Sequence, residues 1–211
     1  MPRKVIESRS DYQHDGTLAY FDRDLYPAVL NLIRQHNGKR VLDIGCGTGA
    51  LSRLLAGIGC KVVGMDPSTT GIAAARGIVP QARFYELGVY DDPALIAERD
   101  FDCVVSTDVI EHLFYPAYLP RFVAAKLKSG GILILSTPYH GYLKNLALSL
   151  CGRWDPHFTP LWDGGHIKFW SRVTLSQLLA TNGFQVVAFR GIGRAPWLWK
   201  DMVLVARKVG P

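Results

Sequence analysis

Short apolar runs alternate with amphipathic segments through the first two thirds of the chain. The apolar runs predict strands at residues 40–44, 61–65, 83–87, 101–106 and 132–136. Apolar residues at helical spacing predict helices at residues 24–35, 50–58, 70–78 and 119–127. Because these strands are apolar throughout rather than at every second position, they are typical of a parallel sheet that is covered on both faces.

The pattern changes after residue 136. Residues 137–170 form a loop-rich stretch, with five aromatic residues between Trp154 and Trp170. A helix is predicted at residues 175–182, and two strands at 185–189 and 202–206 flank a connection rich in Gly, Pro and Trp. Strands joined without a crossover helix are antiparallel. We therefore expect an α/β fold with a Rossmann-like, mostly parallel seven-stranded sheet, helices on both faces and a C-terminal antiparallel hairpin.

Length and composition are those of one globular unit. We expect a single domain over residues 1–211, with an N-terminal helical cap at 1–36 and an aromatic lid inserted at 138–170. A hydrophobic fraction of 48% and a charged fraction of 20% exclude a disordered chain. The apolar runs are far shorter than the roughly 18–20 residues of a membrane span, and the first residues lack the apolar core of a secretory signal. The four cysteines form no CxxC pair, and we expect reduced thiols in the cytoplasm.

A glycine-rich loop, VLDIGCGTG, links the first strand to the next helix. Gly45, Gly47 and Gly49 allow a sharp turn and a close approach of the backbone to a ligand. Asp66 ends the second strand, where a carboxylate can accept the hydroxyls of a ribose. The loop also satisfies the weak dinucleotide fingerprint G-x-G-x-x-A. However, Asp43 would repel a pyrophosphate, and it suits the cationic amino-acid end of S-adenosylmethionine (SAM).

Four sequence blocks in register carry a resemblance to a known family: VLDIGCGTG, VVGMDPS, FDCVVSTDVIEHL and GGILILSTP. With the closing hairpin, they resemble the class I SAM-dependent methyltransferases from about residue 20 onward. The segments DVIEHL and GGHIKFWS make the chain most similar to the branch of the ubiquinone-biosynthesis O-methyltransferases. The resemblance implies SAM as cofactor and S-adenosylhomocysteine (SAH) as its product. The reaction that we expect is O-methylation of a small apolar or aromatic metabolite that bears a hydroxyl.

The resemblance also implies which residues contact the cofactor. The glycine loop would frame the methionine end of SAM, Asp66 would hold the ribose and Met65 would flank the adenine. Asp108 and Val109, after the fourth strand, would line the floor of the site. The full expected set is Asp43, Gly45, Cys46, Gly47, Gly49, Met65, Asp66, Asp108 and Val109.

The chain departs from the family pattern after the third strand. Many relatives carry an acidic residue there that binds the adenine amine, whereas this chain has Gly88 and Val89. Backbone groups or Asp91 would have to take over that contact.

A cluster of acids and histidines follows the fourth strand. Asp108, Glu111 and His112 have the spacing of one face of a helical turn at residues 109–113. We expect His112 and His166 to act as catalytic bases toward a hydroxyl acceptor, with His140 as a third candidate. We assign no metal ligand. Two alternatives stay open: structural roles, with Asp108 capping the turn, or a divalent metal held as in small-RNA terminal 2′-O-methyltransferases, whose E-x-x-E-H block the sequence resembles.

The formal net charge is +6, and residues 190–211 contribute +4 of it. In that segment Trp197 and Trp199 lie near Arg194 and Lys200, a combination that favours peripheral contact with an anionic membrane. The sequence has no basic stripe typical of nucleic-acid-binding proteins, so the partner that we expect is a small-molecule acceptor. An RNA 2′-O-methyltransferase and a catalytically silent SAM-binding protein remain alternatives. The sequence leaves the oligomeric state open.

Overall fold

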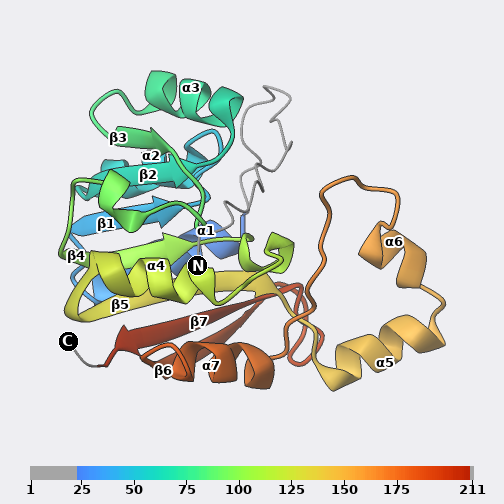
Figure 1. Cartoon of the computed structure of the whole chain (residues 1–211). Coiled ribbons are helices and arrows are strands. Elements are labelled where there is room, and N and C mark those ends of the chain that lie inside the picture. Colours follow the sequence, from blue (N-terminus) through green and yellow to red (C-terminus); the bar gives the residue numbers. More distant parts are fainter. Residues whose placement is uncertain (1–22, 210–211) are drawn as a thin grey trace, which may run out of the picture.

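An open seven-stranded sheet forms the centre of the molecule (Figure 1). The computed structural model describes residues 23–209. The strand order is β3-β2-β1-β4-β5-β7-β6; the first five strands are parallel, and β7 runs antiparallel to β5 and to β6. The expected fold class is confirmed. The strands are β1 (Arg40–Ile44), β2 (Lys61–Asp66), β3 (Arg83–Glu86), β4 (Phe101–Ser106), β5 (Leu127–Pro138), β6 (Phe184–Ile192) and β7 (Asp201–Lys208).

Helices cover both faces of the sheet, as the continuously apolar strands require. On one face, α1 and α2 bury Val29 and Leu55 against Val203. On the other face, α4 and α7 bury Phe122 and Leu175 in a core shared with the strands. The helices are α1 (Leu25–Gln35), α2 (Ala50–Gly57), α3 (Thr69–Ile78), α4 (Tyr118–Lys126), α5 (Tyr142–Leu150), α6 (Trp154–Phe158) and α7 (Arg172–Ala180), with 3-10 turns η1 (Pro93–Leu95) and η2 (Ile110–His112).

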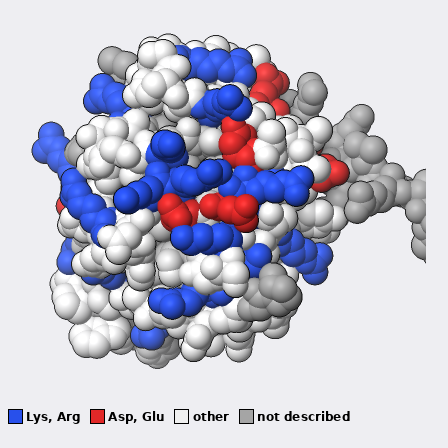
Figure 2. Space-filling view, turned by 90° about the vertical axis from the view of Figure 1, so that its left-hand side faces the viewer, with Lys and Arg blue, Asp and Glu red and all other residues white. Residues whose placement is uncertain are grey.

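The two edges of the parallel strands differ in character. The amino-terminal edge is charged, because β1, β2 and β3 begin with Arg40, Lys61 and Arg83. Basic side chains crowd this face, interleaved with acidic ones (Figure 2), and Arg83 pairs with Glu98 at 3.0 Å. The carboxyl-terminal edge, on the opposite side, carries the glycine loop, η2 and the helices α5 and α6, which project from the sheet (Figure 1).

The loop-rich stretch at residues 137–170 contains two helices that the sequence reading did not predict, α5 and α6. Apolar residues at helical spacing, including Leu143 and Leu146, form α5, and the aromatic density of the segment obscured them. β5 begins at Leu127, directly after α4, rather than beyond the glycines. The buried Lys126 holds that junction, because its ammonium group donates to the carbonyls of Ile96 and Glu98.

Other element boundaries shift by a few residues. α7 begins at Arg172 because Ser171 and Thr174 form a capping box, and both hairpin strands are longer than predicted. Of the cap expected at residues 1–36, residues 1–22 lie outside the described residues; the rest includes α1, which packs on the sheet beside α2. Among residues 23–209, no helix combines the length and the apolar content that a membrane crossing needs.

Candidate active site

The glycine loop is held tightly against the end of β2. The backbone N–H groups of Gly45 and Cys46 both donate to the carbonyl of Met65, at 2.8 and 3.0 Å. Gly45 has φ +74°, and a Cβ there would lie 2.2 Å from Cγ2 of Val109. Only glycine fits this position, and its missing side chain lets Val109 pack directly on the loop.

Two aspartates flank the loop. Asp66 is buried, and its two oxygens accept from the N–H groups of Gly47 (2.9 Å) and Ser68 (2.8 Å). Asp43 is only 1% exposed; its Oδ2 accepts from the hydroxyl of Ser52 at 2.7 Å, while its Oδ1 has no partner. Burial raises the pKa of Asp43 to about 7, the nearby Asp66 adds to the rise, and the Ser52 hydrogen bond opposes it. An unpartnered buried acceptor beside a glycine cradle fits a cationic amino group as its missing partner.

Two members of the expected cofactor set have side chains in the core. Cys46 packs against Ile72 and Phe84, and burial raises the pKa of its thiol well above the ordinary value. Met65 is buried in the core on the other face of the sheet. Cys46 and Met65 contribute to the loop through their backbones, because the Cys46 N–H donates to the Met65 carbonyl.

The turn after β3 carries Gly88 and Val89, so its backbone or Asp91 would have to replace the acidic side chain. Asp91 folds back, and its Oδ2 accepts from the N–H of Gly88 at 2.7 Å. The Gly88 N–H and one oxygen of Asp91, two of the groups that could replace the missing acid, are therefore bonded to each other.

Asp108 does not share a helical face with Glu111 and His112, so that expectation is wrong. Its φ is +53°, and η2 begins two residues later with Val109 as its N-cap, so the capping alternative fails as well. Ser136, at the end of the neighbouring β5, holds Asp108: the Ser136 hydroxyl donates to Oδ1 at 3.0 Å, and the Asp108 N–H donates to that hydroxyl at 3.2 Å.

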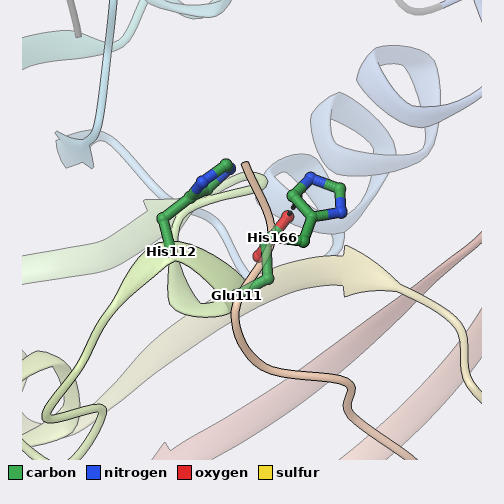
Figure 3. A group of neighbouring side chains, drawn as sticks. All are labelled: Glu111, His112 and His166. Atoms are coloured by element: carbon green, nitrogen blue, oxygen red, sulfur yellow. Dashed lines mark ion pairs between the residues drawn. The ribbon is translucent and has the colours of Figure 1, made fainter. Parts of the chain in front are cut away.

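Glu111, His112 and His166 do come together, with potential ligand atoms all within 4.8 Å (Figure 3). A backbone strap, residues 163–170, brings His166 there: the N–H groups of Ile167 and Lys168 donate to the carbonyl of Glu111, at 2.9 and 3.0 Å. Nε2 of His166 lies 4.0 Å from Oε1 of Glu111, and the imidazole rings of His112 and His166 are 4.8 Å apart, edge to face.

Burial disfavours the charged forms of these three side chains. It raises the pKa of Glu111 well above the ordinary range, with Asp108 adding to the rise, and it lowers the pKa of His166 to about 4, with His112 and His157 adding to the fall. Burial also lowers the pKa of His112, against the opposing effect of the backbone of Gly164. Burial therefore favours the neutral imidazoles of His112 and His166, and it makes the carboxyl group of Glu111 hold its proton more tightly than usual.

The third histidine lies elsewhere, and two functional partners were missed. His140 is buried in the lid, its ring parallel to that of Phe158 with centroids 5.8 Å apart. The hydroxyl of Thr137 donates to Oε2 of Glu111 at 3.0 Å, and Ser136 holds Asp108. The Ser-Thr-Pro run at the end of β5 was the available signal, since polar residues that end a buried parallel strand lie at the crevice.

Comparisons with known proteins agree on one family. The family model described as a methyltransferase domain matches residues 14–188. The ubiquinone biosynthesis O-methyltransferase of Bradyrhizobium diazoefficiens is 31% identical over 203 residues, covering 92% of this chain and 75% of that protein. The protein of the same name from Rhodopseudomonas palustris is 34% identical over 196 residues, covering 90% and 73%. The fold of magnesium protoporphyrin IX methyltransferase from Synechocystis, solved with SAH, matches with a TM-score of 0.64 at 22% identity, over 87% of this chain and 81% of that one.

Proposed function

The chain belongs to the class I SAM-dependent methyltransferases, and from that premise we propose that it methylates a hydroxyl oxygen of a small apolar or aromatic metabolite. The observation that carries the proposal is the neutral histidine pair, His112 and His166, held by η2 and the strap at the carboxyl-terminal edge. The names of the curated relatives, which specify O-methylation in ubiquinone biosynthesis, support a hydroxyl acceptor.

The residues around the glycine loop fit the cofactor. We assign the unpartnered Oδ1 of Asp43 to the amino group of the methionine end and the carboxylate of Asp66 to the ribose. Met65 remains the proposed neighbour of the adenine, and Asp108 and Val109 the proposed floor. SAM supplies a sulfonium-bound methyl group, and in-line placement of the acceptor oxygen provides much of the rate.

The histidines are the proposed bases. With their pKa values lowered by burial, both imidazoles are deprotonated near pH 7 and able to accept the proton of an acceptor hydroxyl. His112 Nδ1 lies 2.9 Å from the carbonyl oxygen of Gly164, which is placed to accept its N–H and so to leave Nε2 as the basic atom. Glu111, whose pKa is raised by burial, lies 4.0 Å from His166 and is placed to exchange a proton with it.

The test is calorimetric titration of metal-free protein with SAH, followed by methyl transfer from labelled SAM to a panel of phenols. We expect Asp66→Ala to abolish SAH binding, while Asp91→Ala, at the same edge of the sheet, retains more of it. Absence of SAH binding to the unaltered protein would overturn the cofactor assignment. SAH binding without methyl transfer to any acceptor would favour the silent SAM-binding alternative.

A second candidate mechanism uses a divalent metal at the same place. Glu111, His112 and His166 offer one carboxylate and two imidazoles, but Asp108 is turned toward Ser136 and is absent from the group. Magnesium added to the SAH titration tests it, because a bound ion near the cofactor would change the affinity. An RNA acceptor has less support: the basic face in Figure 2 lies at the amino-terminal edge, away from the histidines.

We also propose that the protein makes peripheral contact with an anionic membrane. Exposed apolar side chains lie on α5 and on the adjoining β6–β7 connection: Tyr142, Leu146, Leu150, Trp197 and Leu198. Trp199 is not among them, since it packs edge-on against Tyr139 and Phe189. Arg194 beside Trp197 supplies a charge complementary to anionic lipid. Pelleting with phosphatidylglycerol vesicles at low salt, for the unaltered chain and for Trp197→Ala, tests the contact; no pelleting of the unaltered chain would refute it.

We also propose a cytoplasmic location and a single domain in which residues 138–170 form a lid. The four thiols, Cys46, Cys60, Cys103 and Cys151, are all free, which supports a reducing compartment such as the cytoplasm. A one-domain organisation with residues 138–170 as a lid is supported by the strap, which joins the lid to η2. Limited proteolysis with and without SAH tests it, because a lid that covers the site is protected when the cofactor is bound.

A further inference from the structure

Besides a small aromatic cavity within residues 138–170, the structure has a larger hollow, of about 460 Å³, at the amino-terminal edge of the sheet. We call it the basal cavity. Its walls include the apolar side chains of Val62, Val63 and Phe101, which are at most 7% exposed. Ala56 and Ala82 line it as well, and their small side chains leave the space open. The volume lies within the roughly 300–1,000 Å³ of small-molecule pockets, and apolar walls are typical of them.

Three cationic side chains surround the basal cavity. Arg40, Lys61 and Arg83 are the first residues of β1, β2 and β3. The strand register aligns Arg40 with Lys61, and it aligns Arg83 with Val63, two residues further along β2. Because residues two apart on a strand point to the same side, all three side chains leave the same face of the sheet. This is the edge at which basic side chains gather in Figure 2.

The acidic groups next to the cavity are already neutralised. Glu98 lines it, and its two oxygens accept from Arg83 at 3.0 Å and from the hydroxyl of Tyr85 at 2.8 Å. Burial alone would raise the pKa of Glu98, but its hydrogen bonds to Tyr85 and Arg83 outweigh burial and lower the pKa. Glu98 is therefore ionised near pH 7 and balances the charge of Arg83. Asp102, at the same edge, pairs with Lys128 at 2.6 Å.

Arg40 and Lys61 have no acidic partner. The guanidinium group of Arg40 donates to the carbonyl of Arg99 at 2.7 Å and lies 6.0 Å from the ring centre of Phe101, and both of these partners are uncharged. Over residues 23–209, no carboxylate forms an ion pair with Arg40 or Lys61. The basal cavity therefore has two uncompensated positive charges beside its apolar walls.

These features determine the chemistry of a fitting ligand. An apolar body would cover the walls, because removing apolar surface from water is favourable. A phosphate monoester carries a charge of about −1.5 to −2 at pH 7, which matches two cations, whereas a carboxylate carries about −1. A guanidinium fork binds two phosphate oxygens at once, and a lysine ammonium adds a point charge.

We propose that the basal cavity is a second ligand site, for a phosphate monoester with an apolar body the size of a ring. Arg40 and Lys61 hold the phosphate group, and the apolar walls contact the body. The site is separate from the glycine loop, because Gly45 follows Arg40 by five residues, about 16 Å of extended strand. The inference does not depend on the proposed function, since no residue of the basal cavity belongs to the candidate active site.

The probe is phenyl phosphate, and calorimetry in a phosphate-free buffer measures its affinity for the full chain. Inorganic phosphate lacks the ring, and benzoate has the ring but a single charge, so both should bind at least about tenfold more weakly. Lys61→Gln should weaken phenyl phosphate binding about tenfold. Arg153→Gln, at an exposed position near the opposite edge, removes the same charge and is the matched control; it should leave the affinity unchanged.

A second variant tests the apolar part of the cavity. Ala82→Leu fills the hollow, so it should weaken phenyl phosphate binding and leave inorganic phosphate binding unchanged. Thermal unfolding and circular dichroism show whether each variant is folded.

The outcomes separate the basal cavity from the proposed function. No binding of phenyl phosphate, equal affinity for inorganic phosphate or benzoate, or undiminished affinity in Lys61→Gln would overturn the inference. The titration is repeated with saturating SAH, and we expect the same affinity. Loss of phenyl phosphate binding in the presence of SAH would place the phosphate at the glycine loop and refute the basal site. Lys61-dependent binding of phenyl phosphate by a chain that does not bind SAH would uphold the basal site and refute the cofactor assignment.

Discussion

Replacing Asp43 with asparagine tests two effects of this residue separately: its contribution to SAH binding and its cost to the stability of the fold. In the folded chain its pKa is raised from 3.8 to about 7 by burial, with only Ser52 to offset the loss of hydration. The unfolded chain releases this proton near pH 4, whereas the folded chain holds it until about pH 7. The unfolded state therefore gains relative to the folded one as the pH rises through that window. Asparagine has nearly the same shape and does not ionise.

The magnitude follows from the two pKa values. At 1.36 kcal/mol per pH unit, a carboxyl shifted from 3.8 to about 7 destabilises the fold by about 1.5 kcal/mol at pH 5 and about 4 kcal/mol at pH 8. The free energy of unfolding of Asp43→Asn, relative to that of the unaltered chain, should therefore rise by about 2.5 kcal/mol from pH 5 to pH 8. A constant cost of placing the amide cancels in this difference, so the pH dependence carries the test.

The assay is urea unfolding of the cofactor-free protein at pH 5, 6, 7 and 8, for the unaltered chain and the variant. The control is Asp102→Asn. Burial raises the pKa of Asp102, but Lys128, 2.6 Å away, and the backbone of Arg40 and Lys39 outweigh it and lower the pKa. Asp102 therefore stabilises the fold above its unfolded pKa, and the control should be less stable by an amount that is constant from pH 5 to 8. An Asp43→Asn advantage that does not change over that range would refute the reasoning.

The same substitution should weaken the cofactor site. If the Asp43 carboxylate pairs with the amino group of SAM, its loss removes a charge-assisted hydrogen bond, which corresponds to roughly a tenfold to hundredfold loss in SAH affinity. Binding to the unaltered chain should also tighten as the pH rises toward 8, because binding needs the ionised form. Undiminished SAH affinity in Asp43→Asn would remove Asp43 from the cofactor site.

Three further changes test the rest of the site. His166→Ala should lower turnover about 10²- to 10⁴-fold while SAH affinity stays the same, and full activity would remove His166 from the mechanism. Gly45→Ala should destabilise the fold by about 1–3 kcal/mol and abolish SAH binding, because the new Cβ meets Val109 in a left-handed conformation; normal SAH titration would contradict this. Exhaustive chelation should leave turnover unchanged if His112 and His166 act directly, whereas activity restored by magnesium would favour the metal.

The glycine loop and its two aspartates could be located from the sequence because the signals are local. A buried parallel strand ends at a fixed edge of the sheet, and glycines directly after it let the backbone turn there and approach a ligand closely. The strand succession and the antiparallel hairpin followed in the same way, since apolar runs and the absence of a crossover helix are properties of neighbouring residues.

The lid and the acid–histidine cluster depended on contacts between distant segments. Asp108 does not lie on the predicted helical face, because its side chain is hydrogen-bonded to Ser136 on the adjacent strand. His166 reached Glu111 only through the backbone strap, and His140 stayed in the lid because aromatic side chains enclosed it. The sequence by itself determined the sheet and the place of the glycine loop. Only the tertiary structure decided which histidines meet and where residues 138–170 enclose a cavity. Both depend on contacts between segments far apart in the chain, such as the hydrogen bonds from Ile167 and Lys168 to Glu111, and such contacts leave no periodic pattern in the sequence.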